Sequence, residues 1–298
     1  MDIRVLNYFL TVVREHSITR AAEVLHITQP TLSRQLAQME DELGVRLFDR
    51  GSRRITLTSE GLLLRRRAEE ILQLVEKTER ELTEQDEQIE GKITFGCGEI
   101  GSVQLLPDLI ETFHEKYPHV TFDIYSATAD NVKEQMDRGL VDIGLLLEPI
   151  DIEKYDFIRL NMKERWIVVM LPDCQLAEKE YVTAKDLSGL PLIMPRRLKI
   201  QSELASWFGD YYDGLNVLFT SNLNTNAAVM VSRGLGYSIV IEGMMPFWDQ
   251  SKITYRPLYP ELTATSVLAW KRGQPFSPAV TKFIKHIKCF LSMENDKN

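Results

Sequence analysis

The chain has 298 residues, of which 44% are hydrophobic and 26% charged, and its formal net charge at pH 7 is −8. These are ordinary values for folded globular proteins, and the length suggests two or three domains. No apolar run reaches the roughly 18 residues of a membrane span, and the first residues lack a signal-peptide core. Cys97, Cys174 and Cys289 are too scattered for a disulfide framework or a metal site. We therefore expect a soluble cytoplasmic protein that does not bind a membrane.

Charge is unevenly distributed along the chain. Residues 1–67 contain 11 Lys/Arg and 8 Asp/Glu, a net of +3, whereas the remainder contains 24 and 35, a net of −11. A mildly basic N-terminal segment on an acidic chain is typical of a DNA-binding module fused to another domain.

Three short helical patterns come first in the chain. Apolar residues at i, i+3, i+4 and i+7, starting from Leu6 and again from Ile18, predict two amphipathic helices. Thr28 and Pro30 begin a third helix as cap and first-turn residue, and Gly44 ends it. Because only a few residues separate the second and third helices, the pattern predicts a helix-turn-helix unit.

The third helix has a polar face without acids over its N-terminal half. Arg can bind guanine, Gln can bind adenine, and Ser or Thr can bind bases or phosphates. Carboxylates at this position would repel phosphates, so their absence favours insertion of this helix into the major groove of double-stranded DNA. The residues that we expect near DNA are Thr28, Gln29, Pro30, Thr31, Ser33, Arg34 and Gln35.

A polar turn with three arginines follows the third helix, between Phe48 and the alternating segment at residues 55–58. The alternation predicts a half-buried strand, so the segment indicates a β-hairpin wing. Arg50 and Arg53 in this turn are expected at the DNA backbone or in a minor groove. Each arginine alone could be an ordinary surface charge. The order of helix, turn, helix and hairpin is stronger evidence for DNA binding than any single arginine.

These segments resemble a known family. SITRAAEVLHITQPTLSRQL at residues 17–36, LGVRLFDR at 43–50 and LTSEG at 57–61 resemble the N-terminal signature of LysR-type transcriptional regulators. The resemblance implies an effector-responsive regulator that binds an interrupted inverted repeat in double-stranded DNA.

The same resemblance implies an α+β multidomain architecture. Residues 1–58 would form a winged helix-turn-helix DNA-binding domain and residues 59–90 a long linker helix. Residues 91–298 would form a C-terminal two-lobed α/β periplasmic-binding-protein-like domain that binds the effector.

The predicted linker helix has a heptad seam. Its residues recur at alternating spacings of four and three: Leu64, Ala68, Ile71, Val75, Thr78, Leu82, Gln85 and Ile89. Such a seam favours packing against a second copy, so we expect dimerisation through Leu64, Ile71, Val75 and Leu82 in a homodimer or homotetramer. Packing of this helix against the chain's own C-terminal domain is the alternative, and two polar seam residues weaken the coiled-coil interpretation.

Strand and helix patterns alternate in the C-terminal part. Strands are predicted at residues 92–97, 120–126, 142–147, 165–171, 217–221, 237–241 and 265–270, and helices through 105–116, 131–138, 205–212 (capped by Ser202), 225–233 and 277–291. The alternation predicts doubly wound α/β sheets with parallel strands. Combined with the resemblance, it assigns residues 91–164 and 266–298 to lobe I and residues 165–265 to lobe II.

One glycine-rich motif could bind a dinucleotide or a different ligand. Gly96-Cys97-Gly98-Glu99-Ile100-Gly101 fits the dinucleotide pattern G-x-G-x-x-G. Pro107 would interrupt a helix beginning at Gly98, and the second strand ends without the acid that binds a ribose. A dinucleotide enzyme would also leave the DNA-binding pattern unexplained. We therefore favour glycines that let the backbone approach a different ligand.

In the family that the chain resembles, loops after the first two strands of lobe I and facing residues of lobe II line the effector cleft. Carried over by position, the effector-binding residues are Glu99, Ile100, Gly101, Ser102, Ala127, Thr128, Pro195, Arg196, Asn224 and Thr225. Ile100 stands where the family often has a hydroxyl. Cations at 196, 197 and 199, with a helix start, favour a small organic anion. A zwitterion or a cation that meets Glu99 is the second choice.

The competing interpretation is a metabolic enzyme, or a solute-binding protein with an N-terminal dimerisation arm. The five histidines show no metal spacing, and no nucleophile elbow or phosphate-binding loop is found in the sequence. We therefore expect no catalytic activity, no metal and no cofactor. Cys97 lies in the expected cleft, but a lone cysteine in an apolar strand usually serves packing.

Overall fold

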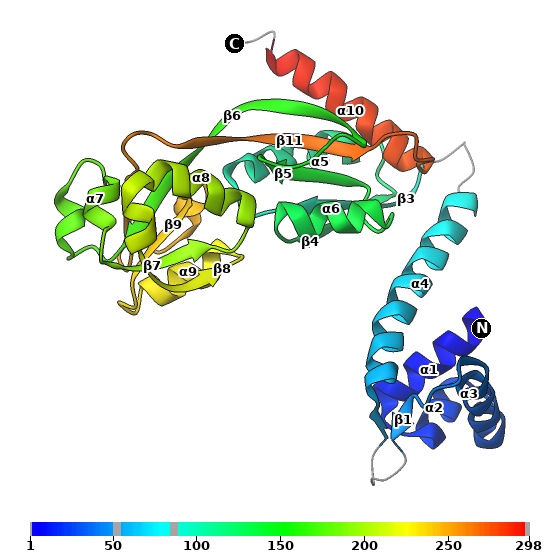
Figure 1. Cartoon of the computed structure of the whole chain (residues 1–298). Coiled ribbons are helices and arrows are strands. Elements are labelled where there is room, and N and C mark those ends of the chain that lie inside the picture. Colours follow the sequence, from blue (N-terminus) through cyan, green and yellow to red (C-terminus); the bar gives the residue numbers. More distant parts are fainter. Residues whose placement is uncertain (1, 50–54, 84–88, 296–298) are drawn as a thin grey trace. The chain divides into compact units, whose positions relative to one another are not determined.

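The computed structural model describes residues 2–49, 55–83 and 89–295. The chain divides into two compact units, Met1–Thr83 and Glu84–Asn298 (Figure 1). The first unit is called the head and the second the effector unit.

The head is a helical domain with a short hairpin. Its elements are α1 (Ile3–Glu15), α2 (Ile18–Val24), α3 (Gln29–Leu43), β1 (Phe48–Asp49), β2 (Thr56–Leu57) and α4 (Ser59–Thr83). The apolar faces of the helices meet in one core, in which Phe9 and Leu32 are fully buried. The Phe9 ring lies 5.3 Å from the ring of Phe48 in β1, so the core also anchors the hairpin. Thr28 caps α3, and Gly44 ends it with a φ of 67°.

The effector unit is built on one mixed sheet of nine strands. Their bounds are β3 (Gly91–Cys97), β4 (Val120–Ser126), β5 (Ile143–Leu147), β6 (Tyr155–Met170), β7 (Pro191–Pro195), β8 (Asn216–Ser221), β9 (Tyr237–Ile241), β10 (Thr254–Pro257) and β11 (Thr263–Lys271). The order is β4-β3-β5-β11-β6-β9-β7-β8, and β10 pairs with β6. The prediction of separate parallel sheets is wrong in two respects: the sheet is continuous, and β6, β10 and β11 run antiparallel to their neighbours.

Two groups of parallel strands define the lobes. In lobe I, β3 pairs with β4 and β5, and in lobe II, β7 pairs with β8 and β9. The long strand β6 pairs with β11 through its first part and with β9 through Trp166–Val169. β6 therefore leads the chain from lobe I to lobe II, and β11 leads it back (Figure 1).

Helices cover both faces of the sheet. They are α5 (Leu106–His114), α6 (Ala129–Asp137), α7 (Ala184–Leu187), α8 (Leu198–Phe208), α9 (Asn224–Val231) and α10 (Pro278–Asn295). Alternate residues of β6 show the two-sided burial: Val168 belongs to the core under α5, α8 and α10, whereas Ile167 and Val169 belong to the core under α9. Burial on both faces explains the near-continuous apolar sequence of this half of the strand.

Some predicted bounds are wrong for physical reasons. The strand predicted at 165–171 in fact begins at Tyr155. The sequence pattern missed its first half because that half is largely exposed and lacks an apolar pattern. Ser202 does not cap a helix; it lies inside α8 and donates to the Leu198 carbonyl at 3.1 Å. α8 ends at Phe208 because Gly209 adopts a positive φ of 54°.

Candidate functional site

The polar face of α3 is open to solvent. Thr28, Gln29, Pro30, Thr31 and Arg34 are exposed, and Ser33 and Gln35 are half-buried, whereas the opposite face of the helix packs in the head core. Among the described residues, the Arg34 guanidinium makes no ion pair. This surface is therefore available to a partner such as DNA.

The first turn of α3 is organised by its own side chains. The Thr28 hydroxyl accepts a hydrogen bond from the Thr31 amide at 3.4 Å, and the two hydroxyls lie 2.8 Å apart. Gln29 donates its side-chain amide to the Ser33 hydroxyl at 2.8 Å. These contacts hold hydrogen-bonding groups in place on the exposed face before any partner binds.

A buried carboxylate joins α3 to the hairpin, and sequence reasoning missed it. Glu40 is only 2% exposed. It accepts from the Leu47 amide at 2.7 Å, the Phe48 amide at 3.3 Å and the Arg46 guanidinium at 3.2 Å. The first acid of α3 thus faces inward, which leaves the outward face free of negative charge over the N-terminal half of the helix.

The hairpin has the predicted pairing where it is described. Phe48 pairs with Leu57 and Asp49 with Thr56 in antiparallel register. Arg50 and Arg53, the predicted wing contacts, lie outside the described residues. Gly61 at the start of α4 touches this region: a Cβ there would lie 2.2 Å from the Leu47 carbonyl oxygen, so only glycine fits.

The predicted dimerisation seam divides into two parts on α4. Leu64 and Ile71 pack against the head's own core beside the fully buried Ala68, so this half of the seam is covered within the chain. Val75 is half-buried, and Leu82 lies in the last turns, whose side chains the structure does not describe. Other leucines are exposed on this helix: Leu62, Leu63 and Leu74.

The effector unit contains a cavity of about 80 Å³ between its lobes. Seven predicted effector-binding residues line it: Glu99, Ile100, Ala127, Thr128, Pro195, Arg196 and Asn224. Residues absent from the prediction complete the wall, among them Leu145, Leu147, Trp166, Ile200, Ser221 and Ile241. The strand ends and helix starts of both lobes converge here, as expected for ligand sites in α/β sheets.

Glu99 crosses from lobe I to the start of α9 in lobe II. Its carboxylate accepts hydrogen bonds from the Thr225 amide at 3.0 Å and from the Thr225 hydroxyl at 2.5 Å. Asn224 donates its side-chain amide to the Glu99 carbonyl at 2.9 Å. The helix start that was predicted to receive an effector anion is thus occupied by the chain's own carboxylate, which is favoured there by the helix dipole.

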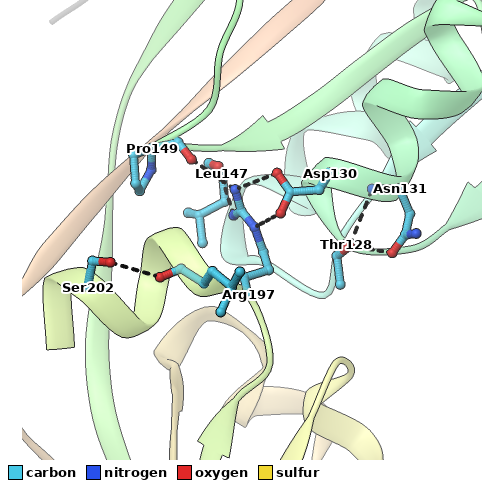
Figure 2. A network of polar contacts seen from close by, with 8 residues as sticks. Thr128, Asp130, Asn131, Leu147, Pro149, Arg197 and Ser202 are labelled. Atoms are coloured by element: carbon cyan, nitrogen blue, oxygen red, sulfur yellow. Dashed lines mark hydrogen bonds and ion pairs between the residues drawn. The ribbon is translucent and has the colours of Figure 1, made fainter. Parts of the chain in front are cut away.

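Arg197 crosses in the opposite direction, from lobe II to lobe I (Figure 2). Its guanidinium donates to the Asp130 carboxylate in α6 at 3.0 and 3.3 Å. It also donates to the carbonyl oxygens of Leu147 at 3.1 Å and Pro149 at 2.9 Å. We call this set of contacts the clasp. Arg197 also belongs to the cavity wall, whereas Asp130 does not.

Gly101 and Ser102, predicted as effector ligands, do not line the cavity. The buried carboxylate of Glu164 accepts hydrogen bonds from their amides at 2.9 and 2.8 Å, and from the Ser102 hydroxyl. These amides would have to bind a phosphate in a dinucleotide site, so the geometry also argues against that alternative. Beside them the backbones of the two lobes lie very close together, because a Cβ on Gly243 would lie 2.0 Å from the Gly101 Cα.

Trp166 lies in the cavity wall and carries a buried donor without a partner in the described part of the chain. The residue is 3% exposed, and its indole N–H has no hydrogen-bond partner among the described residues. Buried N–H groups in folded proteins nearly always have a partner. No motif signals this residue in the sequence; only its place at the crossing between lobes, where β6 enters lobe II, brings it to the cavity.

Cys97 has the environment of a packing residue. It is 3% exposed at the end of β3, and burial raises the pKa of its thiol. A raised pKa lowers the fraction of reactive thiolate, so the site does not favour a redox role. Within residues 2–49, 55–83 and 89–295, no group of three or more His, Cys, Asp or Glu side chains has the arrangement of a metal site. None of the helices described is both long and apolar enough to cross a bilayer.

A winged helix-turn-helix linked to a two-lobed α/β unit with an inter-lobe cavity defines the class of ligand-responsive DNA-binding regulators. The family comparison agrees. Residues 3–62 match the bacterial regulatory helix-turn-helix protein, lysR family, and residues 86–292 match the LysR substrate binding domain. The chain belongs to the LysR family and is a DNA-binding transcriptional regulator with a substrate-binding domain.

Relatives match over nearly their whole length. The chain is 30% identical to the HTH-type transcriptional regulator YybE of Bacillus subtilis (strain 168), over 96% of this chain and 98% of that protein. It is 29% identical to the Hca operon transcriptional activator HcaR of Escherichia coli (strain K12), over 95% and 96%. Full-length CbnR, solved in complex with its target DNA, has the same fold, with a TM-score of 0.73 at 21% identity over 97% of this chain and 99% of CbnR.

Proposed function

We propose that this regulator responds to a small organic anion bound in the inter-lobe cavity, and that the ligand changes how the protein binds or bends DNA. The observation that carries the proposal is Arg196, which lines the cavity and is exposed there, so that its guanidinium supplies a cation in an otherwise largely apolar wall. A guanidinium favours a ligand with a negatively charged hydrogen-bond acceptor.

The contacts of Glu99 support the first of the two ligand classes that the sequence left open. Its carboxylate is engaged by Thr225, so meeting a cationic ligand would require breaking those bonds. Arg197 uses four N–H groups in the clasp, and it lines the cavity as a cation whose fifth N–H has no acceptor among the described residues. Both facts favour an anion over a cation. The cavity volume of about 80 Å³ favours a compact molecule.

The DNA-binding mode that we propose places α3 in the major groove. The exposed polar residues of α3 would contact bases, and the hairpin would contact the backbone or a minor groove. An interrupted inverted repeat would require two heads, and exposed leucines of α4 support a homodimer: Leu63 and Leu74 lie about three helical turns apart. The relatives are transcriptional regulators, which supports a non-enzymatic, cytoplasmic role at the chromosome.

The DNA-binding mode is tested by Arg34→Ala in gel shifts and footprints on a DNA duplex that the parent protein selects from a random pool. We expect a loss of about 1–3 kcal/mol in discrimination at one base step, because a bidentate base contact disappears. Arg14→Ala, which changes an exposed arginine on α1, is the control and should bind as the parent does. An unchanged footprint with Arg34→Ala would show that α3 does not contact bases there.

The ligand class is tested by thermal melts with a panel of small carboxylates and their uncharged amides. A ligand that binds the folded state raises the melting temperature by an amount that grows with the logarithm of the ligand concentration relative to its Kd. We expect stabilisation by at least one carboxylate and a weaker effect of its amide. Arg196→Gln removes the cation but keeps a polar side chain at the cavity, and should weaken that stabilisation. A panel in which only cations stabilise the protein would overturn the proposal.

A further inference from the structure

We propose that the clasp sets how tightly the two lobes close over the effector cavity, with Asp130 acting as a positioning residue outside the cavity. The clasp is a feature of the fold itself. Its consequence for the effector rests on the function proposed above.

The clasp uses the geometry that only arginine provides. Four N–H groups of the planar guanidinium are directed at the Asp130 carboxylate and at the carbonyls of Leu147 and Pro149 (Figure 2). The Arg197 side chain is 10% exposed, whereas that of Asp130 is 51% exposed. A cation so far removed from water needs these acceptors, and all of them belong to the opposite lobe. Separation of the lobes would therefore remove these four hydrogen bonds and leave Arg197 with only the nearby Glu203 carboxylate of its own lobe among the described countercharges.

Both ends of the clasp are attached to regular structure. Arg197 immediately precedes α8, and Asp130 lies in the first turn of α6. The two carbonyls follow or end β5. Because these elements are rigid, a contact between two side chains on them fixes the relative position of the two lobes. Loss of the clasp should therefore weaken other contacts between the lobes along the cleft.

Arg197 joins the clasp to the cavity. Arg197 lines the cavity and at the same time binds lobe I. Its partner Asp130 lies outside the cavity wall. A ligand acceptor that binds the remaining N–H of Arg197 would therefore favour the closed arrangement, and the clasp would preorganise that N–H for the ligand. Substitution of Asp130 separates the two roles, because it removes the clasp partner without removing a cavity residue.

The Thr225 amide offers an independent reporter of closure. It lies in the first turn of α9, where an amide has no acceptor within the helix. Its hydrogen bond goes across the cleft to Glu99 at 3.0 Å, and the residue is otherwise exposed. Exchange of this amide with solvent should therefore follow the population of separated lobes.

The experiment is hydrogen–deuterium exchange of the full chain, without added effector, in the parent and in Asp130→Ala. Overlapping peptides across α9 isolate the Thr225 amide. We expect exchange at Thr225 to become roughly tenfold faster in Asp130→Ala, since a charge-assisted contact partly screened by solvent is lost. Arg197→Lys keeps the charge but loses the planar fork, and should accelerate exchange at least as much.

Glu134→Ala is the matched control. Glu134 lies on the same helix, and its carboxylate pairs with Arg138 at 2.5 Å within lobe I. This variant should exchange at Thr225 as the parent does. An unchanged rate in Asp130→Ala or Arg197→Lys, or equal acceleration in Glu134→Ala, would overturn the clasp. Because no effector or DNA is present, this result is independent of the melts and gel shifts that test the proposed function.

Discussion

The head and the effector unit present their functional residues in opposite ways. In the head, the candidate base contacts come from one short segment, α3 and its cap Thr28, and most of them lie exposed on a helix whose other face forms the core. In the effector unit, the cavity wall comes from segments up to 143 residues apart, Gly98 to Ile241, and two of its charged residues, Glu99 and Arg197, are engaged across the lobes. A surface site needs a stable scaffold beneath it, whereas an inter-lobe site also depends on the contacts that hold the two lobes together.

The largest effect on this comparison is expected from a substitution that destabilises the core of the head alone. Phe9→Ala deletes a ring with 0% exposure that packs on Phe48. We expect the head to lose about 3–5 kcal/mol of unfolding free energy and, with it, DNA binding. Ligand-induced stabilisation of the effector unit should persist, because the two units have separate cores. Urea unfolding and gel shifts measure the two outcomes.

Ile3→Ala is the control for this change. Ile3 lies on the same helix but is 49% exposed, so its truncation should alter stability by less than about 0.5 kcal/mol. If Phe9→Ala also abolished the ligand response, the functional separation of head and effector unit would be refuted.

A smaller effect is expected at the joint between α3 and the hairpin. Glu40→Ala leaves the buried amides of Leu47 and Phe48 without their carboxylate acceptor. We expect a loss of about 2–3 kcal/mol of unfolding free energy, measured by urea denaturation, and weaker DNA binding. Glu42→Ala, at an exposed position on the same helix, should change stability little. Equal stability of the two variants would show that the buried carboxylate does not anchor the hairpin.

The smallest effect concerns pH and the effector unit. The Arg165 guanidinium donates to Glu242 at 2.6 and 2.7 Å and lowers the pKa of that carboxyl. A lowered folded-state pKa stabilises the protein above the unfolded pKa, and this contribution disappears as pH falls through the folded value. Because the Arg165 side chain is 41% exposed, we expect less than about 1 kcal/mol.

The measurement is the unfolding free energy of the parent and of Glu242→Gln at pH 7 and in acid. The difference between the two proteins should shrink in acid, where the parent's carboxyl is protonated. A difference that is the same at both pH values would exclude a charge contribution from this pair.

The contrast between the regions also explains what the sequence could predict. The three helices of the head, the cap at Thr28 and the stop at Gly44 follow from local rules, because each signal lies within a few residues of the element it controls. The lobes and most of the parallel strands also follow from apolar patterns. The first half of β6 does not, since its side chains are largely exposed and its pairing with β11 is a long-range event.

The candidate effector site was predictable only in part. The family resemblance, carried over by position, placed Glu99, Thr128 and Asn224 in what proves to be the cavity wall. The resemblance did not reveal that the carboxylate of Glu164, which is distant in sequence, accepts hydrogen bonds from the amides of Gly101 and Ser102. Nor did it reveal the partners of Arg197, because an arginine's acceptors are set by the meeting of two lobes rather than by neighbours in the chain.

The contact of Gly101 with Gly243 has a practical consequence. The two backbones approach so closely that a single added methyl group at Gly243 would meet the main chain of the other lobe, which has no flexible side chain to move aside. Gly243→Ala should therefore push the two lobes apart at this point by steric bulk. A ligand that favours closure of the lobes would then have to overcome this steric clash.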